Sequence, residues 1–269
     1  MIKKVLRFFY YDLIAQPLHK LGYKKKYGRW DFFNVLGIET TTHCNLRCEW
    51  CPNSKYPRGL KENKKMIDES LFKKVIDELA EIKYGGTIYP FFYGEPLNDE
   101  RIADLISYTR KKLPKSQIKL STNGVLLTKE IYQKLSDAGV TKILINQYTP
   151  EMLPNVKEIL EIDKTAKRKI VEYRIFNYDL RLCNVGGEVK VKNLVERPIC
   201  TYPDYAPYIN YKGDVIICCN DYHGEVVLGN VGKEKLADIW DKPQYKQIRK
   251  ELKKGIYKLP LCRRCVGLE

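Results

Sequence analysis

The sequence lacks any apolar run long enough to cross a bilayer, and it lacks low-complexity stretches. A transmembrane helix needs about 20 consecutive, mostly apolar residues. At the N-terminus, Arg7 and Asp12 interrupt the apolar stretch and no small-residue cleavage site follows, which excludes a secretory signal peptide. We therefore expect a cytoplasmic chain, in a reducing compartment where closely spaced cysteines are typically metal ligands or catalytic groups rather than disulfides.

The sequence also has fewer acidic than basic residues. Its 269 residues include 48 Lys and Arg but 33 Asp and Glu, for a formal net charge of +15. A basic surface favours an acidic partner, such as an anionic substrate, a lipid face or an acidic redox protein. Because the lysines are spread along the whole chain, a plain solvated surface explains them equally well, and we expect no nucleic-acid partner.

Residues 1–34 are expected to form an extension of the main domain. Apolar side chains fall on one helical face before Pro17, namely Ile2, Val5, Leu6, Phe9 and Leu13. A basic amphipathic helix of this kind can make a peripheral membrane contact. More often such a helix covers one end of a domain, and both interpretations stay open.

From residue 35 strand-like and helical patterns alternate. Strands are predicted at 35–41, 87–93, 117–121, 142–146 and 169–176, and helices at 68–83, 99–112 and 128–138. In the first helix Leu71, Val75, Leu79 and Ile82 are expected to face inward. Strands separated by such helices predict βαβ units and a parallel sheet. Five strands are too few for a complete eight-stranded barrel, so we predict an α/β fold with a partial barrel over residues 35–184.

Polar motifs follow four of these strands. They are Cys44, Cys48 and Cys51 after the first, Gly94-Glu95 after the second, Ser121-Thr122-Asn123 after the third and Asn146-Gln147 after the fourth. In α/β barrels the rim at the C-terminal ends of the strands carries the site. The motifs are therefore predicted to face one another.

The C-x3-C-x2-C spacing of the first motif places three thiolates on one short loop. Three cysteines on a four-iron cluster leave one iron without a protein ligand, and so open to a small molecule. A zinc site is the alternative, but the loop supplies only three clustered ligands. The spacing therefore predicts a reaction centre.

After residue 184 the pattern changes again. Cys200 precedes a hairpin predicted over residues 206–219, and a helix with Leu236, Ile239 and Trp240 then leads to a C-x2-C pair, Cys262 and Cys265. Five cysteines in the last seventy residues indicate a second metal site. We predict that residues 185–269 form a small domain around it.

CNLRCEWC after the first strand, with YGEP and STNG at the next two strand ends, resembles the radical S-adenosylmethionine (SAM) superfamily from residue 35 onward. The resemblance implies that Cys44, Cys48 and Cys51 hold a [4Fe–4S] cluster whose open iron is chelated by SAM. It also implies that reduction of this cluster releases a 5′-deoxyadenosyl radical, which takes a hydrogen atom from the substrate. The protein would orient the cofactor and exclude water.

The resemblance further implies a set of SAM contacts. They are Trp50, Gly94, Glu95, Ser121, Thr122, Asn123 and Gln147. Gly94 and Glu95 would bind the methionine amino group, and Trp50 would meet the adenine mostly through its backbone. Tyr93 replaces the first glycine of the usual GGE and leaves the acceptor intact. Taken alone, Glu95 also suits the N-terminus of a helix.

The tail resembles the SPASM/Twitch branch of the superfamily, which adds auxiliary iron–sulfur clusters. Cys200, Cys218, Cys262 and Cys265 match the shorter Twitch version and imply one auxiliary [4Fe–4S] cluster. Cys218 is adjacent to Cys219, and the spacing of the family favours Cys218 as the ligand.

With CPNS at residues 51–54, the chain also resembles the 2-deoxy-scyllo-inosamine dehydrogenase family of aminoglycoside biosynthesis. This implies oxidation of a secondary alcohol on a small polar metabolite, with the auxiliary cluster accepting an electron. Arg174 and Arg181 are the candidate catalytic residues, because an arginine can clamp an anionic group or act as a proton partner. Arg58 could act in the same way.

Three alternatives stay open. Cys183 or Cys219 could return a hydrogen atom and make the enzyme an epimerase. A peptide-modifying maturase is the second, although no segment is spare for a leader-peptide-binding domain. An iron–sulfur electron carrier is the third, but a carrier needs no open iron.

The expected reductant is an acidic flavodoxin or ferredoxin. Tyr89, Tyr148 and Tyr173 are expected to pack in the core or at the rim, and His223 receives no role.

Overall fold

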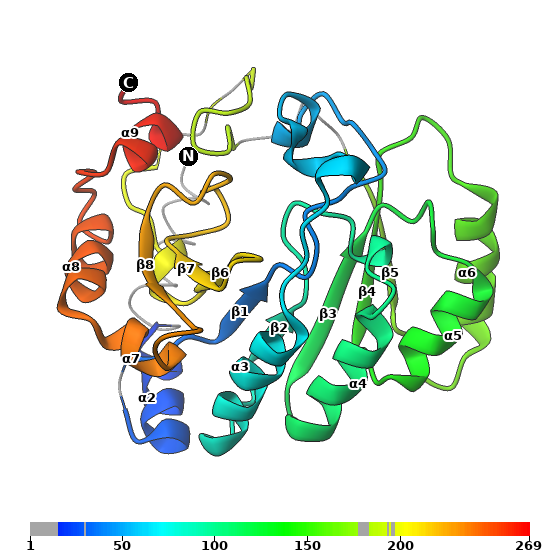
Figure 1. The fold of residues 1–269 in the computed structure, drawn as a ribbon, viewed down its shortest axis with the longest axis horizontal. Helices are drawn as coiled ribbons and strands as arrows, with labels where there is room; N and C mark the ends of the chain where they lie inside the picture. The colour runs from blue at the N-terminus through cyan, green and yellow to red at the C-terminus, as the bar shows by residue number, and fades with distance from the viewer. Residues whose placement is uncertain (1–15, 30, 177–182, 193, 195–196) are drawn as a thin grey trace.

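The structure, a computed structural model, describes residues 16–29, 31–176, 183–192, 194 and 197–269. One eight-stranded sheet runs through it in the order β5-β4-β3-β2-β1-β6-β7-β8 (Figure 1). Its strands are β1 (Val35–Ile38), β2 (Thr87–Tyr89), β3 (Gln117–Thr122), β4 (Lys142–Gln147), β5 (Val171–Ile175), β6 (Tyr208–Ile209), β7 (Asp214–Ile216) and β8 (Val227–Asn230). Strands β1–β6 pair in parallel and β7 and β8 add antiparallel. The predicted α/β fold with a partial barrel is confirmed.

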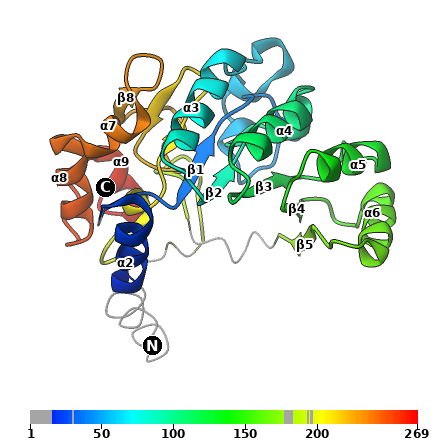
Figure 2. The same ribbon diagram turned by 90° about the horizontal axis from the view of Figure 1, so that it is seen from below.

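The helices lie mainly outside this sheet. They are α2 (Gln16–Tyr27), α3 (Glu69–Glu81), α4 (Ile102–Lys112), α5 (Lys129–Asp137), α6 (Pro154–Thr165), α7 (Leu236–Asp241), α8 (Pro243–Leu252) and α9 (Pro260–Val266). Short 3-10 turns are η2 (Pro52–Ser54), η3 (Pro57–Gly59), η4 (Lys61–Asn63), η5 (Pro96–Asn98) and η7 (Tyr202–Asp204). Helices α3 to α6 follow the convex side of the curved sheet (Figure 2). None of the helices in the described residues is long and apolar enough to cross a membrane.

Side-chain caps and apolar faces explain where the barrel helices begin and how they pack. The Asp68 carboxylate accepts a hydrogen bond from Leu71 N at the start of α3, and the Thr128 hydroxyl accepts one from Ile131 N at the start of α5. The buried face of α3 consists of Phe72, Val75, Ile76 and Leu79. The prediction was right for Val75 and Leu79. Leu71 and Ile82 are only partly buried, because the inward face is centred one residue away from them.

The C-terminal hairpin continues the main sheet. The predicted hairpin is confirmed as β6 and β7, and β6 also pairs in parallel with β1, with Gly37 opposite Tyr208. A Cβ atom on Gly37 would lie 2.3 Å from Tyr208 Cδ1, so only glycine lets that ring cross the strand. Nothing in the sequence indicated that the tail would share the sheet of the barrel.

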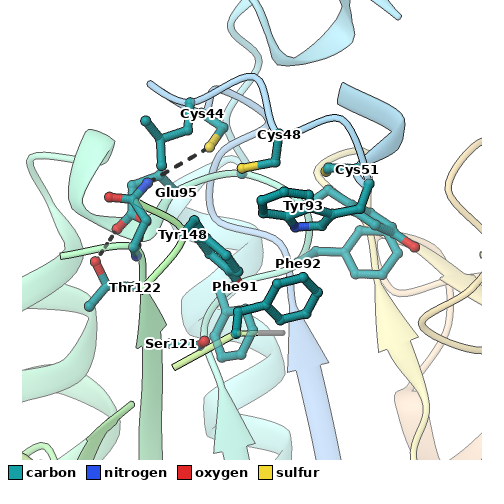
Figure 3. A pocket seen from close by; sticks show the side chains of 15 residues that line it. Cys44, Cys48, Cys51, Phe91, Phe92, Tyr93, Glu95, Ser121, Thr122 and Tyr148 are labelled. Carbon is teal, nitrogen blue, oxygen red and sulfur yellow. Dashed lines mark hydrogen bonds between the residues drawn. The ribbon is translucent and has the colours of Figure 1, made fainter. Parts of the chain in front are cut away.

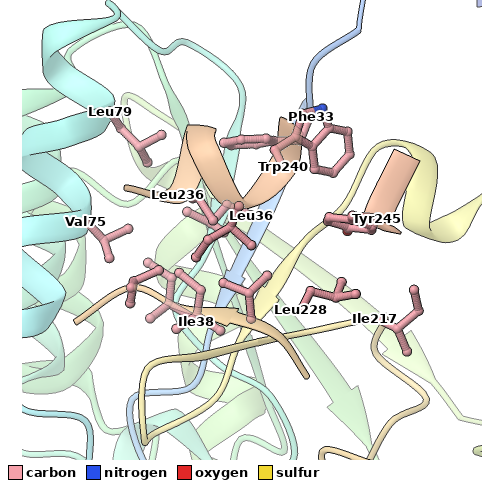
Figure 4. Packing of buried hydrophobic residues seen from close by; sticks show 14 of the residues in the cluster. Phe33, Leu36, Ile38, Val75, Leu79, Ile217, Leu228, Leu236, Trp240 and Tyr245 are labelled. Atoms are coloured by element: carbon pink, nitrogen blue, oxygen red, sulfur yellow. The ribbon is translucent and has the colours of Figure 1, made fainter. Parts of the chain in front are cut away.

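One hydrophobic cluster joins the segment around β1 to the C-terminal helices. Phe33, Leu36 and Ile38 pack with Trp240 and Tyr245 (Figure 4). The Phe33 and Trp240 ring centroids are 5.4 Å apart, and those of Trp240 and Tyr245 are 5.1 Å apart. Two tyrosines of α2, at positions 23 and 27, also pack against this cluster. The predicted amphipathic face at residues 2–13 lies outside the described residues.

Candidate active site

A cavity of about 240 Å³ lies at the C-terminal ends of β1 to β4 (Figure 3). Its lining consists of Cys44, Leu46, Cys48, Trp50, Cys51, Phe91, Phe92, Tyr93, Gly94, Glu95, Ser121, Thr122, Asn123, Tyr148 and Phe176. The structure thus brings together the three cysteines of the loop and every predicted SAM contact except Gln147. This convergence follows from parallel strands, whose C-terminal ends meet at one edge.

Hydrogen bonds within the cysteine loop hold its three thiols along one wall of the cavity. Cys51 N donates to Cys48 O over 2.9 Å, and Cys44 N donates to Gly59 O over 3.1 Å. The Arg47 guanidinium donates to Asn53 O over 2.6 Å and ties the loop to η2. All three thiols stay partly exposed, so they can reach a ligand in the cavity.

Glu95 is the buried carboxylate of the site. Its oxygens accept hydrogen bonds from Leu97 N over 3.2 Å, Thr122 Oγ1 over 2.7 Å and Asn123 N over 2.8 Å. Burial raises the pKa of Glu95 to about 7, although these hydrogen bonds act in the opposite direction. The side chain caps η5, as the alternative interpretation expected, and also lines the cavity. A cationic group beside it would stabilise the carboxylate.

The third motif connects β3 to the cysteine loop. Asn123 Nδ2 donates to Asn45 Oδ1 over 2.8 Å and lies 4.0 Å from Cys44 Sγ. Thr122 Oγ1 also accepts a hydrogen bond from Gly124 N over 3.1 Å. A displacement of this turn would therefore disturb both Glu95 and the thiol of Cys44.

Gly94 has no room for a side chain. A Cβ atom there would lie 2.0 Å from Thr41 O, and the next residue, Glu95, donates its N–H to His43 O over 2.8 Å. The close approach of these two backbones sets the position of Glu95 relative to the cysteine loop.

Aromatic rings form the rest of the cavity wall. Trp50 stacks on Phe176 with ring centroids 5.1 Å apart and an interplanar angle of 27°. Its centroid is 5.9 Å from that of Tyr148. Phe91 and Phe92 lie on the side opposite the thiols (Figure 3). The sequence did not single out these two phenylalanines or Phe176, although Phe91 and Phe92 stand close to the Gly94-Glu95 motif and Phe176 follows β5 directly.

Several predicted residues lie away from the cavity. The Gln147 amide donates to Thr149 O over 2.8 Å and stabilises the loop after β4. Arg174 is 51% exposed and pairs with Glu172 on the same strand. Arg181 lies outside the described residues. Arg58 donates to both oxygens of the buried Glu39 over 2.6 Å, so its charge is already compensated.

A second group of cysteines lies beside the first. Asn220 N donates to Cys218 Sγ and Asn220 Nδ2 donates to Cys265 Sγ, each over 3.4 Å. Cys262 and Cys265 are one turn apart on α9 and therefore share a face. Cys200 is joined to α8 through its N–H, which donates to Leu252 O over 3.0 Å. These segments bring the four predicted auxiliary ligands together.

The two remaining cysteines belong to this second group. Cys183 Sγ donates to Asn220 Oδ1 over 3.3 Å, and Cys219 is adjacent to Cys218. Neither contributes to the lining of the cavity. Tyr93 lies between the groups, because its ring lines the cavity while its hydroxyl donates to Cys219 O over 2.7 Å.

The chemistry of both cysteine groups fits iron–sulfur clusters. Among the described residues, no three His, Cys, Asp or Glu side chains are close enough to hold a single metal ion. Burial raises the pKa of Cys44 to about 11 and that of Cys262 to about 12, so without a metal these thiols hold their protons. Metal coordination deprotonates a thiol outright. The resulting thiolates are the ligands that hold a [4Fe–4S] cluster.

Comparisons with known proteins agree with this chemistry. Residues 38–172 match the Radical SAM superfamily, and residues 200–266 match the SPASM iron–sulfur cluster-binding domain. The SAM-dependent 2-deoxy-scyllo-inosamine dehydrogenase of Niallia circulans is 29% identical over 240 residues, which cover 87% of this chain and 92% of that protein. A GTP 3′,8-cyclase of Clostridium perfringens is 36% identical over 183 residues, or 54% of its length.

Solved structures with a similar fold are known. The crystal structure of BtrN in complex with AdoMet and 2-DOIA superposes with a TM-score of 0.76 at 28% identity, covering 87% of this chain and 93% of that one. Streptococcus suis SuiB bound to its precursor peptide has a TM-score of 0.54 at 14% identity, which shows the fold alone. The cofactors are therefore SAM and two [4Fe–4S] clusters. This chain is a radical SAM enzyme and belongs to that superfamily, with a SPASM iron–sulfur domain at its C-terminus.

Proposed function

We propose that this enzyme dehydrogenates a secondary alcohol on a small polar metabolite. The observation that carries the proposal is the second cysteine group, which lies directly behind the wall of the cavity at Tyr93. An auxiliary cluster with four thiolate ligands has no open iron, which suits an electron acceptor. The similarity to the Niallia circulans dehydrogenase, which extends over 92% of that protein, supports the same reaction class.

Each of three segments would have its own function. Residues 35–184 would bind SAM and the catalytic cluster, residues 185–269 would hold the auxiliary cluster, and residues 1–34 would cover the end of the core. When bound, the catalytic cluster and SAM supply the carbon radical that removes a hydrogen atom from the substrate. Cys44, Cys48 and Cys51 would be the ligands of the catalytic cluster. Cys200, Cys218, Cys262 and Cys265 would be those of the auxiliary cluster.

The cavity residues would orient SAM and exclude water. The Glu95 carboxylate would accept the methionine ammonium group, since it is the buried anion of the cavity. Ser121, Thr122 and Asn123 would reach the ribose and carboxylate. Trp50 and its stacked neighbours would shield the reacting carbon, because closing a site against water prevents side reactions of a reactive intermediate.

The substrate would be a sugar, an aminocyclitol or a phosphorylated relative. That Arg174 and Arg181 recognise the substrate or move its hydroxyl proton stays a prediction from the sequence, and Arg174 does not line the cavity. An acidic flavodoxin or ferredoxin would reduce the catalytic cluster. The cytoplasm would provide the reducing surroundings that thiolate ligands need.

The test is anaerobic turnover with candidate polyols after cluster reconstitution. We expect about eight irons per chain, equal amounts of 5′-deoxyadenosine and product, and a product two hydrogens lighter than the substrate. Cys262→Ala should still cleave SAM but lose the product. Product of unchanged mass that carries solvent hydrogen would instead indicate epimerisation by Cys183 or Cys219. Absence of SAM cleavage in the wild type would refute the proposal.

A further inference from the structure

Tyr93 connects the wall of the cavity to the second cysteine group. Its ring lines the cavity (Figure 3), and its hydroxyl donates a hydrogen bond to Cys219 O over 2.7 Å. Burial raises the pKa of this hydroxyl, so it keeps its proton and remains a donor. The side chain therefore reaches from the cavity to the backbone beside Cys218, one of the four auxiliary cysteines.

The peptide unit between Cys219 and Asn220 extends this contact to a sulfur. Its carbonyl accepts the hydrogen bond from Tyr93, and its N–H, which belongs to Asn220, donates to Cys218 Sγ over 3.4 Å. This peptide is trans, so its carbonyl and its N–H point in opposite directions from one rigid plane. A hydrogen bond accepted by the carbonyl also polarises the peptide and strengthens the bond that its N–H donates. Two hydrogen bonds and one peptide thus separate the Tyr93 ring from Cys218 Sγ.

Contacts from both cysteine-bearing loops hold Tyr93 in this position. Asn53 in η2, directly after the first loop, donates from Nδ2 to Tyr93 O over 2.9 Å and accepts a hydrogen bond from the Tyr222 hydroxyl over 2.8 Å. The Tyr222 ring packs edge-on against the Tyr93 ring, with centroids 4.8 Å apart and an interplanar angle of 79°. Tyr222 and Cys219 belong to the same loop after β7, which therefore contacts Tyr93 at its ring and at its hydroxyl. These contacts fix the orientation of the side chain relative to both cysteine groups.

We propose that Tyr93 is the positioning residue that couples substrate oxidation in the cavity to the auxiliary cluster. This role rests on the proposed dehydrogenation. In that reaction the substrate carbinol loses a hydrogen atom to the SAM-derived radical. The remaining carbon radical becomes a carbonyl by loss of one proton to solvent and one electron to the oxidised auxiliary [4Fe–4S] cluster. The Tyr93 side chain and the Cys219–Asn220 peptide provide a connected path for that electron, and Tyr93 itself is not oxidised. Without the hydroxyl, the peptide carbonyl loses its partner and the N–H is no longer held on Cys218 Sγ.

A redox titration of the reconstituted holoenzyme, followed by electron paramagnetic resonance, tests the coupling without turnover. Tyr93→Phe keeps the ring and removes the hydroxyl, and hydrogen bonds to cluster sulfurs stabilise the reduced cluster. The reduction equilibrium constant of the auxiliary cluster should fall about fivefold, the value of one neutral hydrogen bond, which makes the midpoint ~40 mV more negative for a one-electron couple. Tyr56→Phe is the matched control. It removes a hydroxyl that donates to Glu188 in the same aromatic cluster, and it should leave the midpoint unchanged.

The products of turnover give a second readout. In Tyr93→Phe the substrate radical still forms but is oxidised slowly, so 5′-deoxyadenosine should continue to form at nearly the wild-type rate. Product formation should fall about tenfold, as is typical when a group that supports a metal ligand is removed. The 5′-deoxyadenosine should therefore exceed the product, whereas wild type and Tyr56→Phe should form the two in equal amounts. Tyr93→Leu, which removes both the ring and the hydroxyl, should give at least as large an excess.

Three outcomes would overturn the role of Tyr93. They are an unshifted midpoint in Tyr93→Phe, equal amounts of 5′-deoxyadenosine and product in that variant, and a variant that holds only about four irons per chain. In the last case Tyr93 would retain the cluster rather than couple it to the cavity. If the midpoint shifts as expected but wild type oxidises no polyol, the link from Tyr93 to the auxiliary cluster stands and the proposed substrate class fails. If wild type oxidises a polyol and Tyr93→Phe matches it in both measurements, the dehydrogenation stands and the role of Tyr93 fails.

Discussion

Two side chains, Glu95 beside the first cysteine group and Asn220 beside the second, make the hydrogen bonds on which these groups depend most. The Glu95 carboxylate accepts three hydrogen bonds, one from η5 and two from the end of β3. Asn220 donates to sulfurs from two segments that are far apart in sequence. Both side chains are buried or half-buried. Substitutions there should change SAM affinity or the reduction potential of the auxiliary cluster without exposing apolar surface.

Glu95→Gln should lower the affinity for SAM and remove most of the pH dependence of SAM binding. The pKa of Glu95 is raised to about 7, so the carboxylate is present above that pH and is lost as the pH falls through it. Wild-type affinity should therefore weaken below pH 7, whereas the variant should bind at least about tenfold more weakly at pH 8, in keeping with the loss of one charged hydrogen bond. Equilibrium dialysis at pH 6 and pH 8 measures this. Exposed Glu62→Gln is the control, and an equal change there would contradict the assignment.

Asn220→Ala should make the reduction potential of the auxiliary cluster more negative. Hydrogen bonds to cluster sulfurs stabilise the reduced, more negative state. Removal of Nδ2 should shift the midpoint by about 60 mV, which is ~1.4 kcal/mol for a one-electron couple. A redox titration followed by electron paramagnetic resonance gives the midpoint. Asn230→Ala on β8 should leave it unchanged, and an unshifted midpoint in Asn220→Ala would show that the contact to Cys265 is only structural.

Strand ends and the loops after them build the cavity, and close backbone approaches determine its shape. β2 ends at Tyr89, and the segment after it passes so near Thr41 that only glycine fits at position 94. The predicted strand over 87–93 was too long, because after Tyr89 the chain turns into the cavity wall instead of pairing. Alternating apolar residues alone do not reveal where a strand stops pairing.

Gly94→Ala should destabilise the loop between β2 and α4. The added Cβ would lie 2.0 Å from Thr41 O, so one of the two backbones must move. Overpacking of this kind costs about 1–3 kcal/mol of unfolding free energy, and SAM binding should fall with it. Gly22→Ala is the matched control, since nothing lies within 4 Å of its Cβ position in α2. Chemical denaturation should show that Gly22→Ala gains about 0.5–1 kcal/mol. A similar result for Gly94→Ala would refute the packing argument.

One of the core clusters spans the start of the barrel and the C-terminal segment, while a second cluster fills the part of the barrel around β3 and β4. The strand β6 from the C-terminal segment pairs with β1, and Trp240 from α7 packs on Phe33. The first cysteine group follows β1 and Cys218 follows β7, so both are attached to one sheet, with β6 between the two strands. Their relative placement should therefore be rigid.

Trp240→Ala should destabilise both halves together. Trp240 is fully buried, and truncation of a buried tryptophan costs about 3–5 kcal/mol. Denaturation followed by far-UV circular dichroism and by the absorption of the auxiliary cluster should show one common, lowered midpoint. The exposed Leu268→Ala should change stability by less than about 0.5 kcal/mol. Two separate midpoints would show that the halves unfold independently.

Much of the site was predictable because its residues follow strand ends. Cys44, Gly94 and Asn123 are far apart in sequence, yet parallel strands must bring their C-terminal ends to one edge. The aromatic wall was not predictable in the same way. Phe91 and Phe176 are apolar residues in apolar surroundings, and only packing determines whether such a ring lines a cavity or the core.

The sequence by itself determined the parallel α/β sheet, the two cysteine groups and the superfamily, since periodicity and ligand spacing are local properties of the chain. Only the tertiary structure decided that β6 would pair with β1, that Asn220 would link Cys218 to Cys265, and that Arg58 would be neutralised by Glu39. These are contacts between segments distant in sequence. They depend on how the whole core packs, and no local pattern encodes them.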